Sequence, residues 1–134
     1  MYLNRLSTEQ KELFLDLCIH AAMANNNFAA EEKDMIDQYC IEMQLAQPRY
    51  TAVKDTNAVI DELKKISTPQ EMKMILLEIT GLILSDNIYD DDEQKFMNSF
   101  AESIGVDKSC LNNMVASLNE LKKLYLRIDS LVMG

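Results

Sequence analysis

The chain has 134 residues, of which 48% are hydrophobic, and its formal net charge is −9. This hydrophobic content excludes a disordered chain, and the length predicts a single domain over residues 1–134. The negative charge argues against nucleic acid and membrane surfaces as partners, because a negative protein repels phosphate groups.

The chain has three Cys residues and one His. No two Cys form a CxxC pair, so the ligands of a structural zinc site are lacking. Cys18 and Cys40 fall on predicted core positions, and His20 has no evident nucleophile or orienting partner. No apolar run reaches the length of a membrane span, and no targeting leader is evident. We therefore expect a cytoplasmic protein that is not an enzyme.

In chain order, the first predicted unit is a helical hairpin over residues 7–45. Ser7 and Gln10 have the spacing of a capping box, in which each side chain accepts the other residue's backbone N–H. They predict a helix over about 8–24, and apolar residues at helical spacing predict a second helix over about 30–45. The first helix is apolar around most of its circumference, so we expect it in the middle of a bundle.

The connection between the hairpins contains one further predicted helix. A short helical turn is expected to begin at Pro48. A linker helix is predicted over residues 56–66, because one face of this segment carries the apolar residues Val59, Ile60, Leu63 and Ile66.

Residues 68–105 repeat the first hairpin at an offset of 61 positions. Thr68 and Glu71 again have the spacing of a capping box. Helices are predicted over about 69–85 and 91–105, and their apolar positions match those of the first hairpin without a gap. The pattern predicts two helix–turn–helix repeats related by pseudo-symmetry.

The remaining segment, about 107–132, predicts a C-terminal helix. Within it, Leu124 to Met133 is the candidate for an exposed apolar strip, which would pack on the domain or form a homodimer. The fold class is therefore all-α, with about six or seven helices in a bundle and short connections.

The two hairpin turns place similar residues at matching positions. Asn26 and Asn87 tolerate positive φ, so the first helix of each hairpin is expected to end there. Tyr89 follows two positions later and is expected to place its ring between the helices. Glu32 and Glu93 lie in the first turn of the next helix, where a carboxylate suits the helix dipole.

This pattern resembles that of TerB-like domains, a family named for a bacterial tellurite-resistance protein. In that family a small acidic or amide pair, an aromatic or aliphatic residue and then a Glu recur in both halves of an all-helical fold. The pairs here are Asn25-Asn26 and Asp86-Asn87, and both glycines typical of the family are replaced by Asn. The resemblance covers roughly residues 8–110. It implies a cytoplasmic binding module linked to stress or tellurite resistance and associated with metal.

The acidic run SDNIYDDDEQ has three interpretations. In the first, Asp86, Asp90, Asp92 and Glu93 supply oxygen ligands to calcium or manganese, although their spacing does not fit an EF-hand. In the second, Asp90 or Asp91 caps the following helix, and the other acids face its positive end. In the third, the run docks a protein partner.

The sequence thus predicts a non-enzymatic binding or adaptor module with a protein partner. The alternative is a regulatory protein that binds a divalent cation through residues 86–93. A di-iron enzyme is disfavoured, because the Glu-x-x-His ligand pairs of such bundles are missing. The residues expected to form the binding turns are Asn25, Asn26, Glu32, Asn87 and Tyr89.

Overall fold

The computed structural model describes residues 1–24, 30–45, 48–86 and 89–134, and these residues form helices and no strands. Short 3-10 turns precede the first helix and follow the fourth, at Leu3–Arg5 and Leu84–Asp86. The six α-helices are α1 (Thr8–Ala22), α2 (Ala30–Glu42), α3 (Thr56–Ile66), α4 (Pro69–Ile83), α5 (Asp91–Ser103) and α6 (Lys108–Met133). The predicted all-α class is therefore confirmed.

Side-chain caps fix where the helices begin. Ser7 and Thr68 each form a complete capping box, with Gln10 and Glu71 respectively. The caps satisfy backbone N–H groups that have no partner within the helix, which is worth about 1 kcal/mol each. Asp55 and Asp107 cap α3 and α6 in the same way, although without the reciprocal bond.

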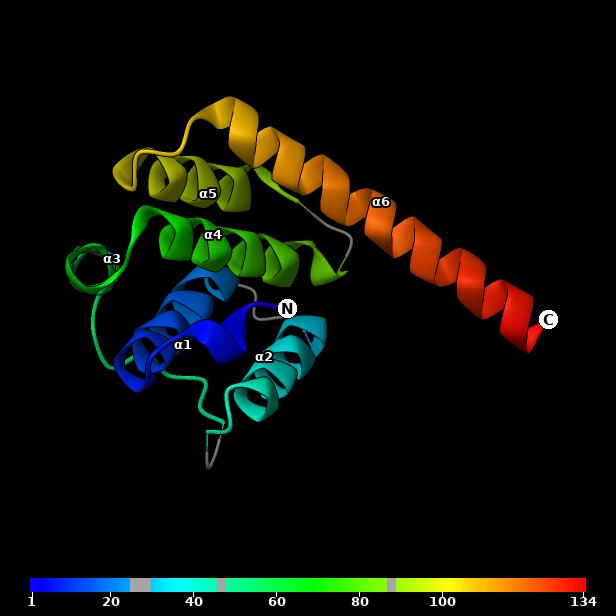
Figure 1. Ribbon diagram of the computed structural model, residues 1–134, viewed down its shortest axis with the longest axis horizontal. Coiled ribbons are helices and arrows are strands. Elements are labelled where there is room, and N and C mark those ends of the chain that lie inside the picture. The colour runs from blue at the N-terminus through cyan, green and yellow to red at the C-terminus, as the bar shows by residue number, and fades with distance from the viewer. Residues whose placement is uncertain (25–29, 46–47, 87–88) are drawn as a thin grey trace.

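The core lies around α1 and α4, as the sequence predicts for the two most apolar helices. Phe14, Leu17, Ile75 and Ile79 are fully buried at its centre. In Figure 1, α4 lies between α5 on one side and α1 with α2 on the other, and α3 packs against α1. A helix placed inside the bundle buries most of its circumference, which explains why α1 after Glu12 and α4 after Lys73 carry few polar residues.

The segment after α2 differs from the prediction, because no helical turn begins at Pro48. This segment is instead tied to α1 by Asp16. The Asp16 carboxylate pairs with Arg49 Nη1 at 2.5 Å and accepts the backbone N–H groups of Val53 and Lys54 at 3.0 and 3.2 Å. These bonds fix residues 49–54, which form an irregular segment with bends that leads into α3.

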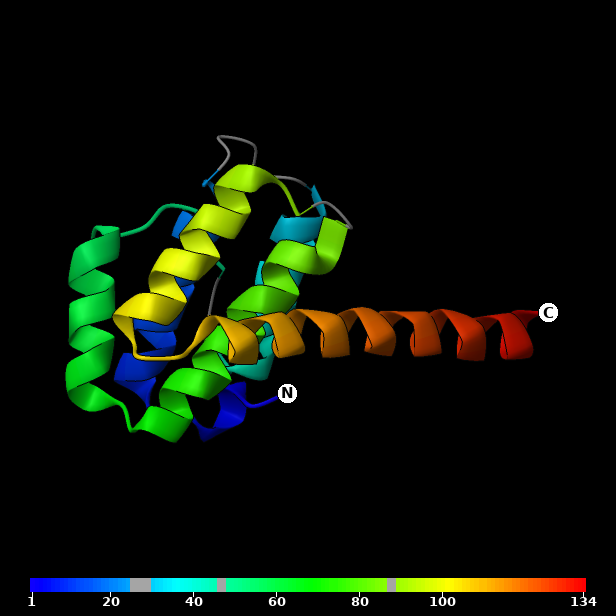
Figure 2. The same cartoon turned by 90° about the horizontal axis from the view of Figure 1, so that it is seen from above.

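Helix α6 is a single helix of 26 residues, and it extends well beyond the other five (Figure 1). Figure 2 shows from above that its first turns cross the body while its last turns have no helix beside them. The direction of α6 is set by the turn before it, where Gly105 has a φ of +77° and the N–H of Val106 bonds to Ala101 O at 2.9 Å. A positive φ costs Gly no steric strain, so it suits this turn.

Candidate functional site

The acidic turn is a helix cap, as the second interpretation predicts. Asp90 is the N-cap of α5, and its Oδ1 accepts the N–H of Glu93 at 2.9 Å. In return, Glu93 Oε1 accepts the N–H of Asp90 at 3.3 Å. Two of the four residues predicted to bind a cation are thus bonded to each other's backbone.

Glu93 is buried to an unusual degree for a carboxyl group. Its exposed fraction is 1%, and its Oε2 atom has no hydrogen-bond partner among the described residues. Burial raises the pKa of Glu93 to about 7, and the charges of Asp90 and Asp86 raise it further, whereas the backbone N–H of Asp90 lowers it. Glu93 therefore places in the interior a carboxyl oxygen that accepts no hydrogen bond from the described residues.

The other predicted ligands lie in different surroundings. Asp86 is half-buried at the end of the 3-10 turn, near enough for its charge to act on Glu93. Asp92 is exposed and lines a separate cleft between α3 and α5. Over the described ranges, no three His, Cys, Asp or Glu side chains meet in an arrangement suited to a metal ion. The cation site stays a prediction.

The predicted turn residues are only partly described. Asn25, Asn26 and Asn87 lie outside the described residues. Glu32 is buried in the first turn of α2, the position that Glu93 has in α5. Tyr89 is half-buried and packs against the core, and this burial raises its pKa. The expectation that its ring enters the space between helices therefore holds in part.

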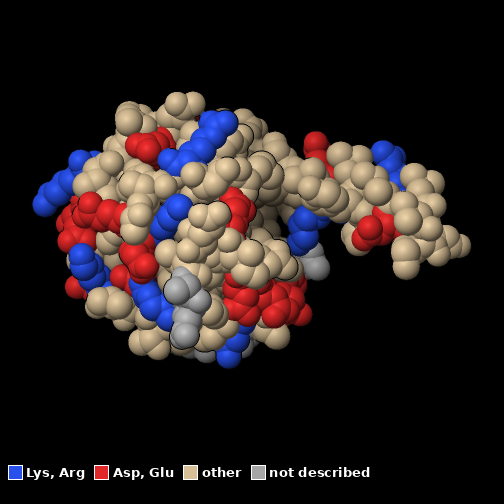
Figure 3. All heavy atoms as spheres, turned by 60° about the horizontal axis from the view of Figure 1, so that its bottom comes forward, with Lys and Arg blue, Asp and Glu red and all other residues tan. Residues whose placement is uncertain are grey.

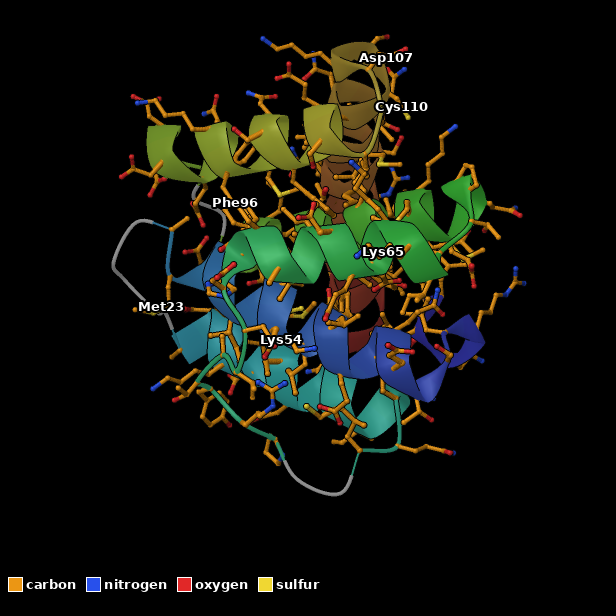
Figure 4. The ribbon with its side chains drawn as sticks, turned by 90° about the vertical axis from the view of Figure 1, so that its left-hand side faces the viewer. Met23, Lys54, Lys65, Phe96, Asp107 and Cys110 are labelled. Carbon is orange, nitrogen blue, oxygen red and sulfur yellow. The ribbon has the colours of Figure 1, made fainter. Side chains whose placement is uncertain are left out.

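The cleft between α3 and α5 has a volume of about 420 Å³. Ile60 and Phe96 provide apolar lining, and Asn57, Asp92 and Lys95 are among its polar residues. In Figure 4, Phe96 extends from α5 toward α3, into the space that separates the two helices. Local sequence patterns could not predict this cleft, because its walls come from helices that are far apart along the chain.

The last turns of α6, residues 123–133, form a projection that we call the arm. Every arm residue is exposed, and Figure 3 shows the arm as a surface with few charged side chains. Leu131, Val132 and Met133 are exposed by 80%, 76% and 84% respectively. The other large apolar residues exposed on the arm are Leu124, Tyr125, Leu126 and Ile128. Exposed apolar surface of this kind marks interaction sites in soluble proteins. The predicted exposure of this strip is confirmed.

Two of the three cysteines, Cys18 and Cys40, occupy the core positions that the sequence predicts. Cys18 and Cys40 are buried, and burial raises the pKa of both thiols. Cys110 is half-exposed where α6 begins, close to the cap residue Asp107 (Figure 4). His20 is half-buried, and its Nε2 forms a hydrogen bond with the carbonyl of Lys54 at 2.7 Å. These contacts give the four side chains roles in packing and in the loop before α3.

Comparison of the chain with models of protein families, with curated proteins and with solved structures found no match. Among the described helices, none is both long enough and apolar enough to cross a bilayer.

Proposed function

We propose that this chain is a non-enzymatic binding module that docks protein partners through the arm, residues 123–133. The observation that carries this proposal is the exposure of seven large apolar side chains on one helical segment. Leaving such groups in water costs free energy, at roughly 25 cal/mol per Å² of apolar surface. A partner that covers them recovers this free energy, and the rigid helix presents them with little loss of backbone entropy on binding.

We propose further that the fold is TerB-like, with two pseudo-symmetric repeats over residues 7–45 and 68–105. Several matches at the same offset of 61 positions support this. The bounds of α1 and α4, and those of α2 and α5, differ by 61 residues at both ends. Gln44 and Gly105 both have positive φ, and the N–H that follows each of them bonds to a carbonyl five residues earlier. The link to stress or tellurite resistance is part of this proposal.

The arm is tested with a designed amphipathic peptide that carries Leu at the a and d positions of a heptad repeat. We expect a fluorescently labelled peptide to bind the wild-type chain, as measured by anisotropy. A double variant, Tyr125→Ser with Ile128→Ser, should bind at least about tenfold more weakly, which corresponds to about 1.4 kcal/mol.

The control variant combines Lys123→Ala with Ser130→Ala, because both residues lie on the opposite face of the arm. It should bind the peptide like the wild type. A scrambled peptide of the same composition should bind neither protein. Equal binding of the heptad peptide to all variants, or no binding at all, would remove the arm as the docking element.

A second candidate function is regulation by a divalent cation at the acidic turn. The observation that favours it is the buried Oε2 atom of Glu93, which lacks a partner among the described residues. Calcium and manganese bind carboxylate oxygens, and a cation would stabilise the charged form of a carboxyl group that burial disfavours. Asp86 and Asp90 are near enough to contribute negative charge.

The cation proposal is tested by thermal unfolding of chelator-treated protein titrated with calcium or manganese. A cation that binds only the folded state raises the melting temperature by mass action. We expect a saturable rise in the wild type, loss of this rise in Glu93→Gln, and its retention in Asp91→Asn, which removes an adjacent exposed carboxylate. A rise that survives in Glu93→Gln would show that the cation binds elsewhere.

A further inference from the structure

The apolar residues of α6 follow the spacing of a coiled coil. Their separations alternate between three and four residues, the pattern that places one continuous stripe along a helix. We call this set the seam, and its members are Leu111, Met114, Leu118, Leu121, Tyr125, Ile128 and Val132. The separations hold without interruption from one end of the helix to the other.

The body covers only the first half of the seam. Leu111 is buried, and Met114, Leu118 and Leu121 are half-buried where α6 packs on α4 and α5. From Lys123 onward every residue is exposed, so Tyr125, Ile128 and Val132 continue the same stripe into solvent. The face that binds the body thus extends beyond it.

A hollow of about 370 Å³ lies where the arm leaves the body. Leu118 and Tyr125 of the seam line one side of it, and Met35 of α2 and Leu77 of α4 line the other. Glu42 and Glu78 also line it, and their carboxylates both pair with the N-terminal ammonium of Met1 at 3.1 Å. The seam therefore faces a notch with apolar walls, in which two carboxylates are balanced in part by one ammonium group.

We propose that two copies of this chain associate by pairing their arms in antiparallel orientation, with each arm tip entering the notch of the other copy. This inference rests on the proposed function and names the partner that the arm docks. Charge supports it, because residues 121–134 carry three basic side chains and one acidic side chain, whereas the whole chain has a formal charge of −9. The basic arm of one copy would lie against the notch of the other, where the ammonium of Met1 balances only one of the two carboxylate charges.

The heptad positions favour the antiparallel orientation. In antiparallel coiled coils, residues at the a positions of the heptad face residues at the d positions of the partner helix. Tyr125 and Val132 occupy a positions, and Leu121 and Ile128 occupy d positions. Tyr125 therefore faces Ile128 of the second copy, and Leu121 faces Val132 of the second copy. The flanking positions then place Leu124 beside Leu131 of the second copy on one side. On the other side they place Asp129 near Lys122 of the second copy, whose ammonium also donates a hydrogen bond to the carbonyl of its own Leu84.

A parallel pair fits the same residues less well. It would place Leu124 beside Asp129 of the second copy, an apolar group against a charge. It would also bring both bodies to the same end of the pair, although the body is much wider than a helix (Figure 2). The antiparallel pair keeps the bodies at opposite ends and covers the apolar side chains of both arms.

Association is tested by sedimentation equilibrium over a range of protein concentrations. We expect the wild type to pass from monomer to dimer as its concentration rises. Ile128→Asp places a charge in the seam and should weaken the dimer at least about tenfold, which corresponds to about 1.4 kcal/mol. Ser130→Asp adds the same charge on the opposite face and should dimerise like the wild type. A wild type that stays monomeric at all concentrations would overturn the proposal.

Orientation is tested by disulfide trapping in a Cys110→Ser background, because the other two cysteines are buried. A mixture of Leu124→Cys and Leu131→Cys chains should form a mixed disulfide dimer. Val132→Cys alone should form none, since the two copies of this residue lie at opposite ends of an antiparallel pair. The reverse result would establish a parallel pair and overturn the orientation.

Failure of this inference differs from failure of the proposed function. A monomeric wild type that binds the designed heptad peptide would show that the arm docks a different protein, so only the dimer would be rejected. A monomer that binds no peptide would reject both proposals.

Discussion

Glu93 is a carboxyl group that the fold removes from water at the first turn of α5. Its Oε1 atom completes the helix cap, while its Oε2 atom has no partner among the described residues. Because burial disfavours the charged form, the pKa of Glu93 rises from the ordinary value of 4.5 to about 7. Between these two pH values the folded state binds a proton more tightly than the unfolded state does. This group's contribution to stability is therefore present at low pH and is lost as the pH rises to 7.

We expect Glu93→Gln to reduce this loss, because the amide keeps an oxygen for the N–H of Asp90 but cannot ionise. Between pH 5 and pH 8, the wild type should lose about 2–3 kcal/mol more of its free energy of unfolding than the variant does. Urea unfolding in the presence of a chelator measures the difference. Asp92→Asn, at an exposed position, should follow the wild type. Parallel pH profiles for wild type and Glu93→Gln would show that Glu93 titrates normally.

At the scale of elements, Asp16 joins α1 to the segment that leads into α3. It is buried, pairs with Arg49 and accepts two backbone N–H groups. We expect Asp16→Ala to lower the free energy of unfolding by about 2–3 kcal/mol, because it leaves several donors without an acceptor. Chemical denaturation followed by circular dichroism measures this.

Glu12 offers a matched control, since its carboxylate contacts the same guanidinium at 3.5 Å but is exposed. Glu12→Ala should change the free energy of unfolding by less than about 1 kcal/mol, as for most surface ion pairs. Equal losses in the two variants would mean that the ion pair with Arg49, and not the backbone bonds of Asp16, holds the segment.

The helices could be predicted from the sequence because their signals are local. The caps at Ser7, Thr68 and Asp107 lie within a few residues of the groups that they bind, and apolar periodicity marks each helix face. The path after Pro48 could not be predicted in this way. Asp16 occurs in the middle of a helix and resembles a solvated charge, and only its contact with residues more than 30 positions later makes it structural.

At the scale of the whole molecule, the sequence predicted an exposed strip but not its geometry. The apolar residues from Leu124 to Met133 could equally have folded back on the body. Their exposure depends on the direction of α6, which the turn at Gly105 and the packing of Leu111 determine. The buried state of Glu93 is a similar case, because a carboxylate in the first turn of a helix is usually solvated. Both features arise from packing between distant segments, which local patterns do not record.

The length of α6 has a consequence for how strongly the chain could hold a ligand. At 1.5 Å per residue, its 26 residues span about 39 Å, and a rigid helix keeps its two ends at this fixed distance. Two bodies joined through their arms would present two identical acidic turns at a fixed separation. A target with two sites at a matching spacing would then gain avidity, because the second contact forms at a high effective concentration. A target with sites at another spacing would gain no avidity. The length of the helix would therefore select targets by the distance between their two sites.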